Sequence, residues 1–214
     1  MPKYKLVVFD MDGTLLETRS CWAHIHEHFG TDNSDMLKLY INHKITDEEF
    51  VQADINLWQS KSERKIDEYY INSLLDEIKP MEGAGELIEF LHRNDIETAI
   101  ISGGIQYLAD KWAKKWKMHF AIANELIDDK NGKLMFKEGA SGNNKGPVID
   151  RLVKNLNLKK ENIVAVGDTI VDIPLFERSG LSIAVNTKDK RVIKKADYHH
   201  KEKNLEGLMN IIKN

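Results

Sequence analysis

Acidic and small polar side chains follow three apolar runs of this sequence, at the point where each run ends. Asp10 and Asp12 follow residues 6–9, Ser102 with Gly103 and Gly104 follows residues 96–101, and Asp168 with Asp172 follows residues 163–166. If the runs are parallel strands, their carboxyl ends lie at one edge of a sheet, which is where open α/β sheets bind ligands. The sequence therefore predicts one site that combines carboxylates, a hydroxyl group and glycine-rich turns.

Carboxylates that gather at one edge repel one another and need a cation to offset their charge. An oxygen-only ligand set without His or Cys nearby favours a hard ion, and Mg²⁺ is the expected one. Ser102 and the amides of Gly103 and Gly104, at a helix start, suit an anion. Lys145 follows residues 139–144, which have the composition of a flexible loop, and is expected to bring a mobile positive charge over the site. The expected anion is a phosphate group, carried by a small phosphorylated substrate.

Asp10 and Asp12 are spaced as two carboxylates that share one face of an extended chain. One member of such a pair can attack phosphorus, while the other can protonate the leaving alkoxide and later activate water. Gly13 suits a tight turn beside them, and Thr14 can orient a carboxylate through a hydrogen bond. Lys145 and the metal would offset the charge on the transferring phosphoryl group.

Short apolar runs alternate with helical stretches over most of the chain. Runs of strand type cover 6–9, 96–101, 163–166 and 181–185, and helical stretches cover 85–92, 147–156 and 173–178. This alternation is typical of a parallel sheet with right-handed crossovers. Asn131-Gly132, with apolar residues on both sides, predicts a hairpin. The expected fold class is α/β, with a doubly wound parallel sheet.

Residues 17–79 interrupt this alternation because they contain no run of strand type. Amphipathic segments at 36–40, 50–58 and 66–75 predict helices, and Thr46 with Glu49 has the pattern of a capping box. We expect a small helical domain over 17–79, inserted after the first strand, and a core formed by 1–16 and 80–214. Three histidines, His24, His26 and His28, are expected to be structural or to line a pocket, because no Cys accompanies them as a metal ligand.

The composition excludes several classes of function. The 214 residues include 31 basic and 34 acidic side chains, so the net charge of −3 gives no electrostatic case for nucleic acid or an anionic membrane as the main partner. The single cysteine, Cys21, excludes an internal disulfide and fits a reducing compartment. The apolar run near the start is too short for a signal peptide or a membrane span, so we expect a cytoplasmic location. The sequence leaves the oligomeric state open.

Four motifs occur in a fixed order in this chain. They are Asp10-x-Asp12-Gly13-Thr14, Ser102-Gly103-Gly104, Lys145-Gly146 and Gly167-Asp168-x-x-x-Asp172. In this order they resemble the haloacid dehalogenase (HAD) superfamily of phosphatases, and most of all its phosphoserine phosphatase-like group, which also shares the segment Asn124-Glu125-Leu126. The resemblance covers about residues 1–16 and 80–214. It implies a Rossmann-like core and a cap, formed by the insert, that closes over the site and selects the substrate.

The resemblance also implies a role for each motif residue. Asp10 is the nucleophile that becomes an aspartyl phosphate, and Asp12 is the general acid and base, whose main-chain carbonyl also binds Mg²⁺. Asp168 is a metal ligand, and Asp172 belongs to the inner or outer coordination sphere. The phosphate is held by Ser102, Gly103, Gly104 and Lys145.

Three positions depart from the phosphoserine phosphatase pattern. That group has a glutamate for the substrate ammonium nine positions after the nucleophile, where this chain has Arg19. Asp54 stands in place of a cap arginine that holds the substrate carboxylate, and Val171 replaces an asparagine. Since an arginine repels an ammonium, we expect a small phosphomonoester other than phosphoserine, with Arg19 contacting a second acidic group of it or pairing with Asp54. Trp58 is a further candidate for contact with the substrate.

The same motifs are also compatible with other functions. The specificity of phosphoserine phosphatase proper is one alternative, and a mutase that moves a phosphoryl group between positions of a sugar is another. Release of free phosphate separates hydrolysis from the mutase reaction. A non-catalytic ligand-binding protein is the alternative from a different class, and it predicts that replacement of Asp10 changes no activity.

Overall fold

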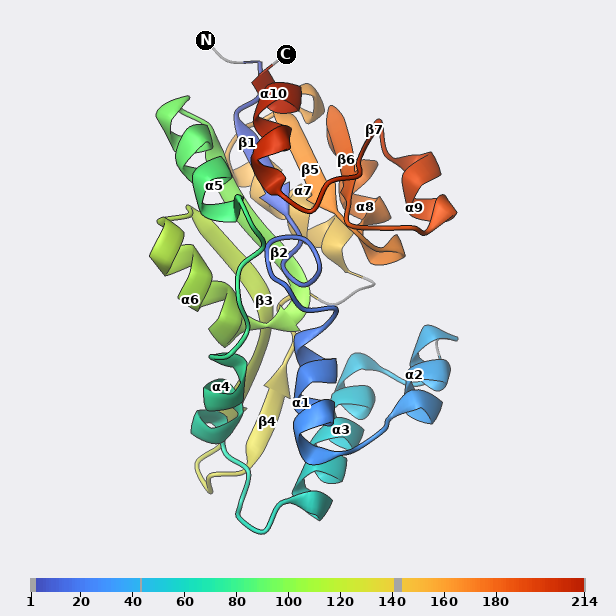
Figure 1. The fold of residues 1–214 in the computed structure, drawn as a ribbon. Coiled ribbons are helices and arrows are strands. Elements are labelled where there is room, and N and C mark those ends of the chain that lie inside the picture. Colours follow the sequence, from blue (N-terminus) through green and yellow to red (C-terminus); the bar gives the residue numbers. More distant parts are fainter. Residues whose placement is uncertain (1–2, 43, 141–143, 214) are drawn as a thin grey trace.

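The computed structural model describes residues 3–42, 44–140 and 144–213, and its strands form one seven-stranded sheet in the order β4-β3-β2-β1-β5-β6-β7 (Figure 1). The strands are β1 (Leu6–Phe9), β2 (Glu97–Ile105), β3 (Phe120–Asp128), β4 (Leu134–Lys137), β5 (Ile163–Gly167), β6 (Leu181–Val185) and β7 (Tyr198–His200). Neighbouring strands are parallel, except that β3 and β4 form an antiparallel hairpin. The predicted α/β class is confirmed, and the hairpin lies where Asn131-Gly132 predicted it.

Helices cover both faces of the sheet, which is why its strands are apolar throughout. The helices are α1 (Cys21–Phe29), α2 (Ser34–Ile41), α3 (Asp47–Lys61), α4 (Glu68–Leu75), α5 (Ala84–Arg93), α6 (Gln106–Trp116), α7 (Lys145–Asn155), α8 (Ile173–Phe176), α9 (Lys190–Lys195) and α10 (Leu208–Lys213). Val7 and Phe9 of β1 belong to the apolar cluster shared with α5, α6 and α10. Leu6 and Val8 point to the opposite face and pack in the cluster of α7, α8 and α9. The sheet is therefore doubly wound, as predicted.

Helices α1 to α4 occupy the stretch between β1 and α5, at the carboxyl edge of the sheet (Figure 1). The predicted capping box is present at the start of α3, where the Thr46 side chain accepts from the Glu49 backbone N–H and the Glu49 side chain accepts from Thr46. The β3–β4 hairpin extends beyond the rest of the sheet toward these helices, and it packs on α3 and α4. The hairpin thus joins the helical segment in forming the surroundings of the site.

Two boundaries differ from the prediction in ways that affect the site. Strand β2 continues to Ile105, so the Ser102-Gly103-Gly104 turn lies within an irregular end of the strand, where its register with β3 shifts, rather than at a helix start. A Cβ at Gly104 would lie 2.6 Å from Met11 Cε, so the end of the Met11 side chain packs directly against this turn. Helix α7 begins at Lys145, two residues before the predicted start. Positions 141–143 of the predicted loop lie outside the described residues.

None of the helices in the described ranges combines the length and the apolar character that a membrane crossing requires.

Candidate active site

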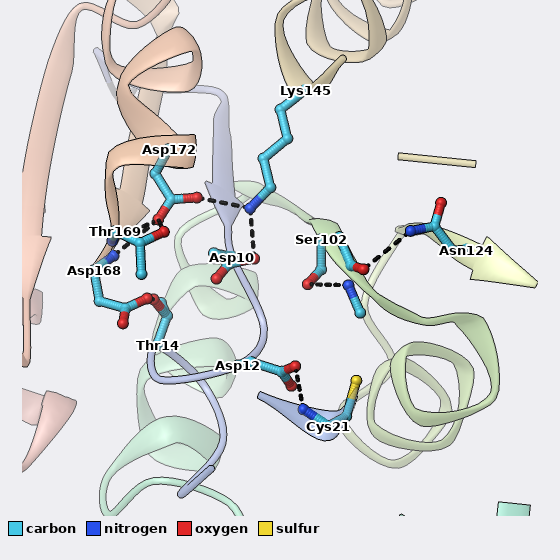
Figure 2. Close-up of polar contacts among 12 residues, drawn as sticks. Asp10, Asp12, Thr14, Cys21, Ser102, Asn124, Lys145, Asp168, Thr169 and Asp172 are labelled. Atoms are coloured by element: carbon cyan, nitrogen blue, oxygen red, sulfur yellow. Dashed lines mark hydrogen bonds and ion pairs between the residues drawn. The ribbon is translucent and has the colours of Figure 1, made fainter. Parts of the chain in front are cut away.

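Three carboxylates converge at the carboxyl edge of the sheet (Figure 2). Asp10 follows β1, while Asp168 and Asp172 follow β5, the parallel neighbour of β1. One oxygen from each of these three side chains lies within 4.8 Å of the other two. The convergence predicted from the ends of the apolar runs is therefore what the structure places at this edge.

Lys145 is the central cation of this cluster (Figure 2). Its Nζ lies 2.7 Å from Asp10 Oδ1 and 2.7 Å from Asp172 Oδ1, and its side chain is only 1% exposed. Burial alone would lower the pKa of Lys145, but the two carboxylates outweigh burial and raise it well above its usual value. The prediction that a loop brings Lys145 over the site as a mobile charge is thus wrong. Lys145 is the first residue of α7, and two buried ion pairs hold its amine in the site.

Asp172 is held in place by donors on both of its oxygens. Oδ1 accepts from Lys145, and Oδ2 accepts from the backbone N–H of Asp168 (3.0 Å) and from the N–H and hydroxyl of Thr169 (2.9 and 3.1 Å). A carboxylate with this many donors is suited to positioning its neighbours. Asp172 therefore orients both the amine of Lys145 and the backbone that carries Asp168.

Asp168 is oriented by the first motif. The Thr14 hydroxyl donates to Asp168 Oδ1 at 3.1 Å, so the carboxylate that Thr14 holds is Asp168. Gly13 has a φ of +75°, and a Cβ at this position would lie 2.4 Å from Asp168 Oδ2. Only glycine combines this backbone conformation with this close approach, so Gly13 lets the first motif pack directly against Asp168.

Burial and the repulsion between carboxylates raise the pKa values of Asp10 and Asp168. Burial is the main cause that raises the pKa of Asp10 to about 6, with Lys145 opposing it and Asp172 adding to it. Burial, followed by the charges of Asp10 and Asp172, raises the pKa of Asp168 to about 8. One lysine does not balance three carboxylates, and the donor set is composed of oxygen only. The residues present therefore fit a hard divalent cation.

Asp12 has a different environment from Asp10, although only one residue separates them. Its Oδ2 accepts the backbone N–H of Cys21 at 2.7 Å, while its buried Oδ1 finds no partner within residues 3–42, 44–140 and 144–213. Burial raises the pKa of Asp12, and the hydrogen bond from Cys21 opposes the shift. Asp12 is thus a carboxyl group that retains a proton more readily than an exposed aspartate and has one oxygen available to a ligand.

Ser102 and the two glycines after it supply hydrogen-bonding groups on the side of the site near β2. Ser102 is 2% exposed, and its Oγ accepts the N–H of Gly104 at 3.1 Å. Because a serine hydroxyl also carries a proton, Ser102 can donate to an anion while it holds this turn.

Asn124 connects the Ser102-Gly103-Gly104 turn to the segment before Lys145. Its Nδ2 donates to the Gly103 carbonyl at 3.0 Å, and its Oδ1 accepts the N–H groups of Gly139 (3.0 Å) and Ala140 (3.2 Å). In the sequence, Asn124 stands out only as part of the segment Asn124-Glu125-Leu126 that the resemblance includes. The available signal was an amide side chain two residues before Leu126-Ile127, the apolar pair on the first side of the predicted hairpin.

We expect the Asn124→Ala substitution to weaken both the fold and turnover. The change leaves the N–H groups of Gly139 and Ala140 without their acceptor, which costs about 2–3 kcal/mol of unfolding free energy. Turnover should fall about 10-fold, because the turn and Lys145 lose their common support. Urea denaturation and the separate values of kcat and KM measure these effects. Asn155→Ala removes an exposed amide from α7 and is the matched control; an equal loss in both variants would contradict the positioning role.

A cavity of about 730 Å³ extends from Asp10 and Asp12 to helices α1, α2 and α3. Arg19 and Asp54 both line it, as does His26. The alternative in which Arg19 pairs with Asp54 is wrong, because Asp54 Oδ1 accepts from His26 and Asn33 instead, while Arg19 is exposed. Trp58 is fully buried behind His26, so its ring does not line the cavity.

Residues 4–180 match the family model of the haloacid dehalogenase-like hydrolases. The match covers well over half of the chain and includes Asp10, Asp12, Lys145, Asp168 and Asp172. The chain therefore belongs to this family, as its motifs predicted.

Within the family, the chain is similar to phosphoserine phosphatases. It is 32% identical over 220 residues to that of Archaeoglobus fulgidus, covering 98% of this chain and 60% of that relative's length. It is 30% identical over 217 residues to that of Methanocaldococcus jannaschii, with 99% of each chain covered. The expected enzyme class is confirmed: the protein is a phosphatase of the phosphoserine phosphatase-like kind.

Two solved structures give the same result for the fold. A substrate-bound phosphoserine phosphatase complex has a TM-score of 0.81 at 28% identity, and all of both chains is covered. A phospho-aspartyl intermediate analogue of phosphoserine phosphatase has a TM-score of 0.80 at 29% identity, with 99% of this chain and 100% of that chain covered. Both the α/β core and the helices between β1 and α5 are thus present in these two solved structures.

Proposed function

We propose that the protein is a Mg²⁺-dependent phosphomonoester hydrolase that acts on a small phosphorylated substrate through an aspartyl phosphate on Asp10. The observation that carries the proposal is the pair of 2.7 Å contacts by which buried Lys145 joins Asp10 to Asp172, beside Asp168 and at one end of a large cavity. Residues 17–79, which contain α1 to α4, act as the cap, and the core consists of 1–16 and 80–214.

Asp10 is the nucleophile in this mechanism. Lys145 holds Oδ1 of Asp10, so the other carboxylate oxygen is the one that attacks phosphorus. The amine of Lys145, in contact with Asp10, and the buried hydroxyl of Ser102 at the end of β2 stabilise the charge on the transferring phosphoryl oxygens. Mg²⁺, when bound by Asp10, Asp168 and the main-chain carbonyl of Asp12, neutralises further negative charge. Asp172 orients Lys145 and Asp168 from the outer sphere.

Asp12 is the general acid and base. Burial raises the pKa of Asp12, which favours the protonated form of this carboxyl group. The leaving alkoxide takes up that proton when the bond from phosphorus to the ester oxygen breaks. The Asp12 carboxylate formed in this step then removes a proton from the water that attacks the aspartyl phosphate. Oδ1 of Asp12 has no hydrogen-bond partner among the described residues, so it is the oxygen that gives and later takes up the proton.

The substrate proposed is a phosphomonoester other than phosphoserine. Arg19 and Asp54 both line the cavity, and both differ in charge from the residues that the phosphoserine phosphatase pattern has there. A panel of phosphoserine and of sugar, glycolate and nucleotide phosphates, assayed with Mg²⁺ for free phosphate, tests this. Phosphoserine as the best substrate by a wide margin would refute the altered specificity, and absence of phosphate release from every ester would refute the hydrolase.

We expect Mg²⁺ to raise the thermal midpoint strongly at pH 8 and weakly at pH 5.5. The raised pKa values of Asp10 (about 6) and Asp168 (about 8) mean that the folded protein binds more protons than the unfolded chain between pH 4 and 8. Stability of the metal-free protein therefore falls as the pH rises through this range. Mg²⁺ binds the ionised carboxylates, and saturation at about 100 times its Kd adds ~2.7 kcal/mol, or about 5–10 °C, at pH 8.

Calorimetry in Mg²⁺ and in KCl of the same ionic strength measures this difference. Asp168→Asn removes one proposed ligand and should abolish most of the shift at pH 8. An equal Mg²⁺-induced shift at both pH values would contradict the assignment of the cation to these carboxylates.

A further inference from the structure

A buried carboxylate lies in the cavity outside the catalytic cluster. Asp54 of α3 is 1% exposed, although aspartate is rarely buried without a charged partner. Its Oδ1 accepts from His26 Nε2 of α1 at 2.8 Å and from the side-chain amide of Asn33. These contacts connect α1 and α3 across one wall of the cavity, and both Asp54 and His26 line that wall.

His26 contacts its neighbours through both ring nitrogens. Its Nε2 lies 2.8 Å from Asp54 Oδ1 and donates to this oxygen. Its Nδ1 lies 2.7 Å from Thr31 Oγ1 and 3.2 Å from the indole Nε1 of Trp58. These contacts hold the imidazole ring against Oδ1 of Asp54 and leave Oδ2 out of the network.

The second oxygen of this carboxylate differs from the first in its surroundings. Asp54 Oδ2 is buried and finds no hydrogen-bond partner in the described parts of the chain, whereas Oδ1 has two. A buried carboxylate oxygen without a donor is costly, so a ligand group that donates to it gains a strong, charge-assisted hydrogen bond. Since Asp54 lines the cavity that also contains Asp10, such a ligand group can belong to the substrate.

The other charges along the helical wall favour a cation over a neutral donor. Glu27, Asp32, Asp47 and Asp54 all line this part of the cavity, against one guanidinium, that of Arg19. Arg19 is exposed and also lines a neighbouring surface pocket with Glu17 and Glu77, so solvent and these carboxylates screen it. The sequence pointed to Arg19 as the residue that selects the substrate. In the structure, Arg19 is exposed, and the buried charged residue on this wall of the cavity is Asp54.

We propose that Asp54 binds a protonated amine on the alcohol portion of the substrate, so that the preferred substrates are phosphomonoesters of amino alcohols that lack a carboxylate. The inference rests on the proposed function, because it assigns the phosphate of the same molecule to Asp10 and Lys145. His26, Asn33 and Trp58 are positioning residues that hold the carboxylate with Oδ2 free for the amine. A substrate carboxylate near Asp54 is repelled, which disfavours phosphoserine.

The test compares three alkyl phosphates of matched chain length that end in an amine, a methyl group or a carboxylate. With Mg²⁺ present, kcat/KM for the amine should exceed that for the methyl ester by about 10- to 100-fold, the range expected for one hydrogen bond to a buried charge. The carboxylate ester should be the poorest. Equal values for amine and methyl esters, as expected if only water satisfies Oδ2, would overturn the inference, and so would a preference for the carboxylate.

Two controls separate this inference from the proposed function. p-Nitrophenyl phosphate carries no amine, so its hydrolysis without any preference for the amino ester refutes the inference alone, while failure to hydrolyse any ester refutes the proposed function. Asp54→Asn should reduce the amine-to-methyl ratio to near 1. Asp35→Asn, an exposed carboxylate of α2, should retain the wild-type ratio. The wild-type comparison decides the question even if the Asp54 variant fails to fold.

Discussion

Asp10→Asn is expected to abolish phosphatase turnover, with a loss of at least about 10⁴-fold in kcat, the scale on which removal of a covalent nucleophile acts. The amide retains the size of the side chain but cannot attack phosphorus. Lys145 keeps its second partner, Asp172, at 2.7 Å, so the ion pair that organises the site survives the change. The substitution also removes one of the mutually repelling carboxylates, so we expect no loss of thermal stability in metal-free buffer.

Steady-state phosphate release with p-nitrophenyl phosphate and Mg²⁺ measures the loss. The matched control is Asp150→Asn, since Asp150 is an exposed carboxylate of α7 whose ion pair with Arg178 lies at the surface. Its kcat should stay within a factor of about 2. Substantial activity in Asp10→Asn would exclude the aspartyl phosphate, and unchanged activity would favour the non-catalytic alternative together with an unrelated contaminating hydrolase.

The core of the fold was predictable because its strands are apolar on both faces. Strands β1 and β6 have the bounds read from the sequence, since helices on both sides of the sheet require a continuous apolar run with polar residues at each end. The same reasoning located the acidic groups, because the carboxyl ends of β1 and β5 are neighbours in any parallel sheet that pairs them. Asp10 and Asp168 thus lie together for a reason visible in the sequence.

Features that depend on contacts between distant elements were not predictable in this way. Strand β3 is only partly buried and mixes polar with apolar residues, so no run indicated it, and β7 has only three residues. The ion pairs of Lys145 with Asp10 and Asp172 depend on where α7 begins relative to β1. The partner of Asp54 depends on how α1 packs against α3. That packing places His26 beside Asp54, whereas the inverted charges at the two specificity positions had offered Arg19 as one possible partner. Residue types indicated the chemistry, whereas partners required the tertiary structure.

Lys145→Ala is expected to damage both catalysis and stability. Three carboxylates then lie together without a cation, and removal of one member of a buried ion pair typically costs about 3–5 kcal/mol. Loss of a fixed positive charge beside the transferring phosphoryl group should also lower kcat by about 10²- to 10³-fold. Urea denaturation in metal-free buffer and phosphate release with Mg²⁺ measure the two effects. Lys137→Ala removes an exposed lysine that pairs with Glu125 and should change stability by less than about 1 kcal/mol.

The pH dependence distinguishes this electrostatic effect from loss of packing alone. The raised pKa of Lys145 means that its favourable contribution is complete below its usual value near 10.5 and is lost as the pH rises from there through the higher folded value. Lys145 lowers the pKa values of Asp10 and Asp168, which burial still raises to about 6 and about 8 in the wild type. Its removal raises both values further, so ionisation of these carboxyl groups destabilises Lys145→Ala more than it destabilises the wild type. The stability gap between wild type and variant should therefore widen from pH 5 to pH 8 in the absence of metal. A gap that is independent of pH would mean that Lys145 stabilises the site only by filling space, and that the buried ion pairs with Asp10 and Asp172 contribute nothing to it.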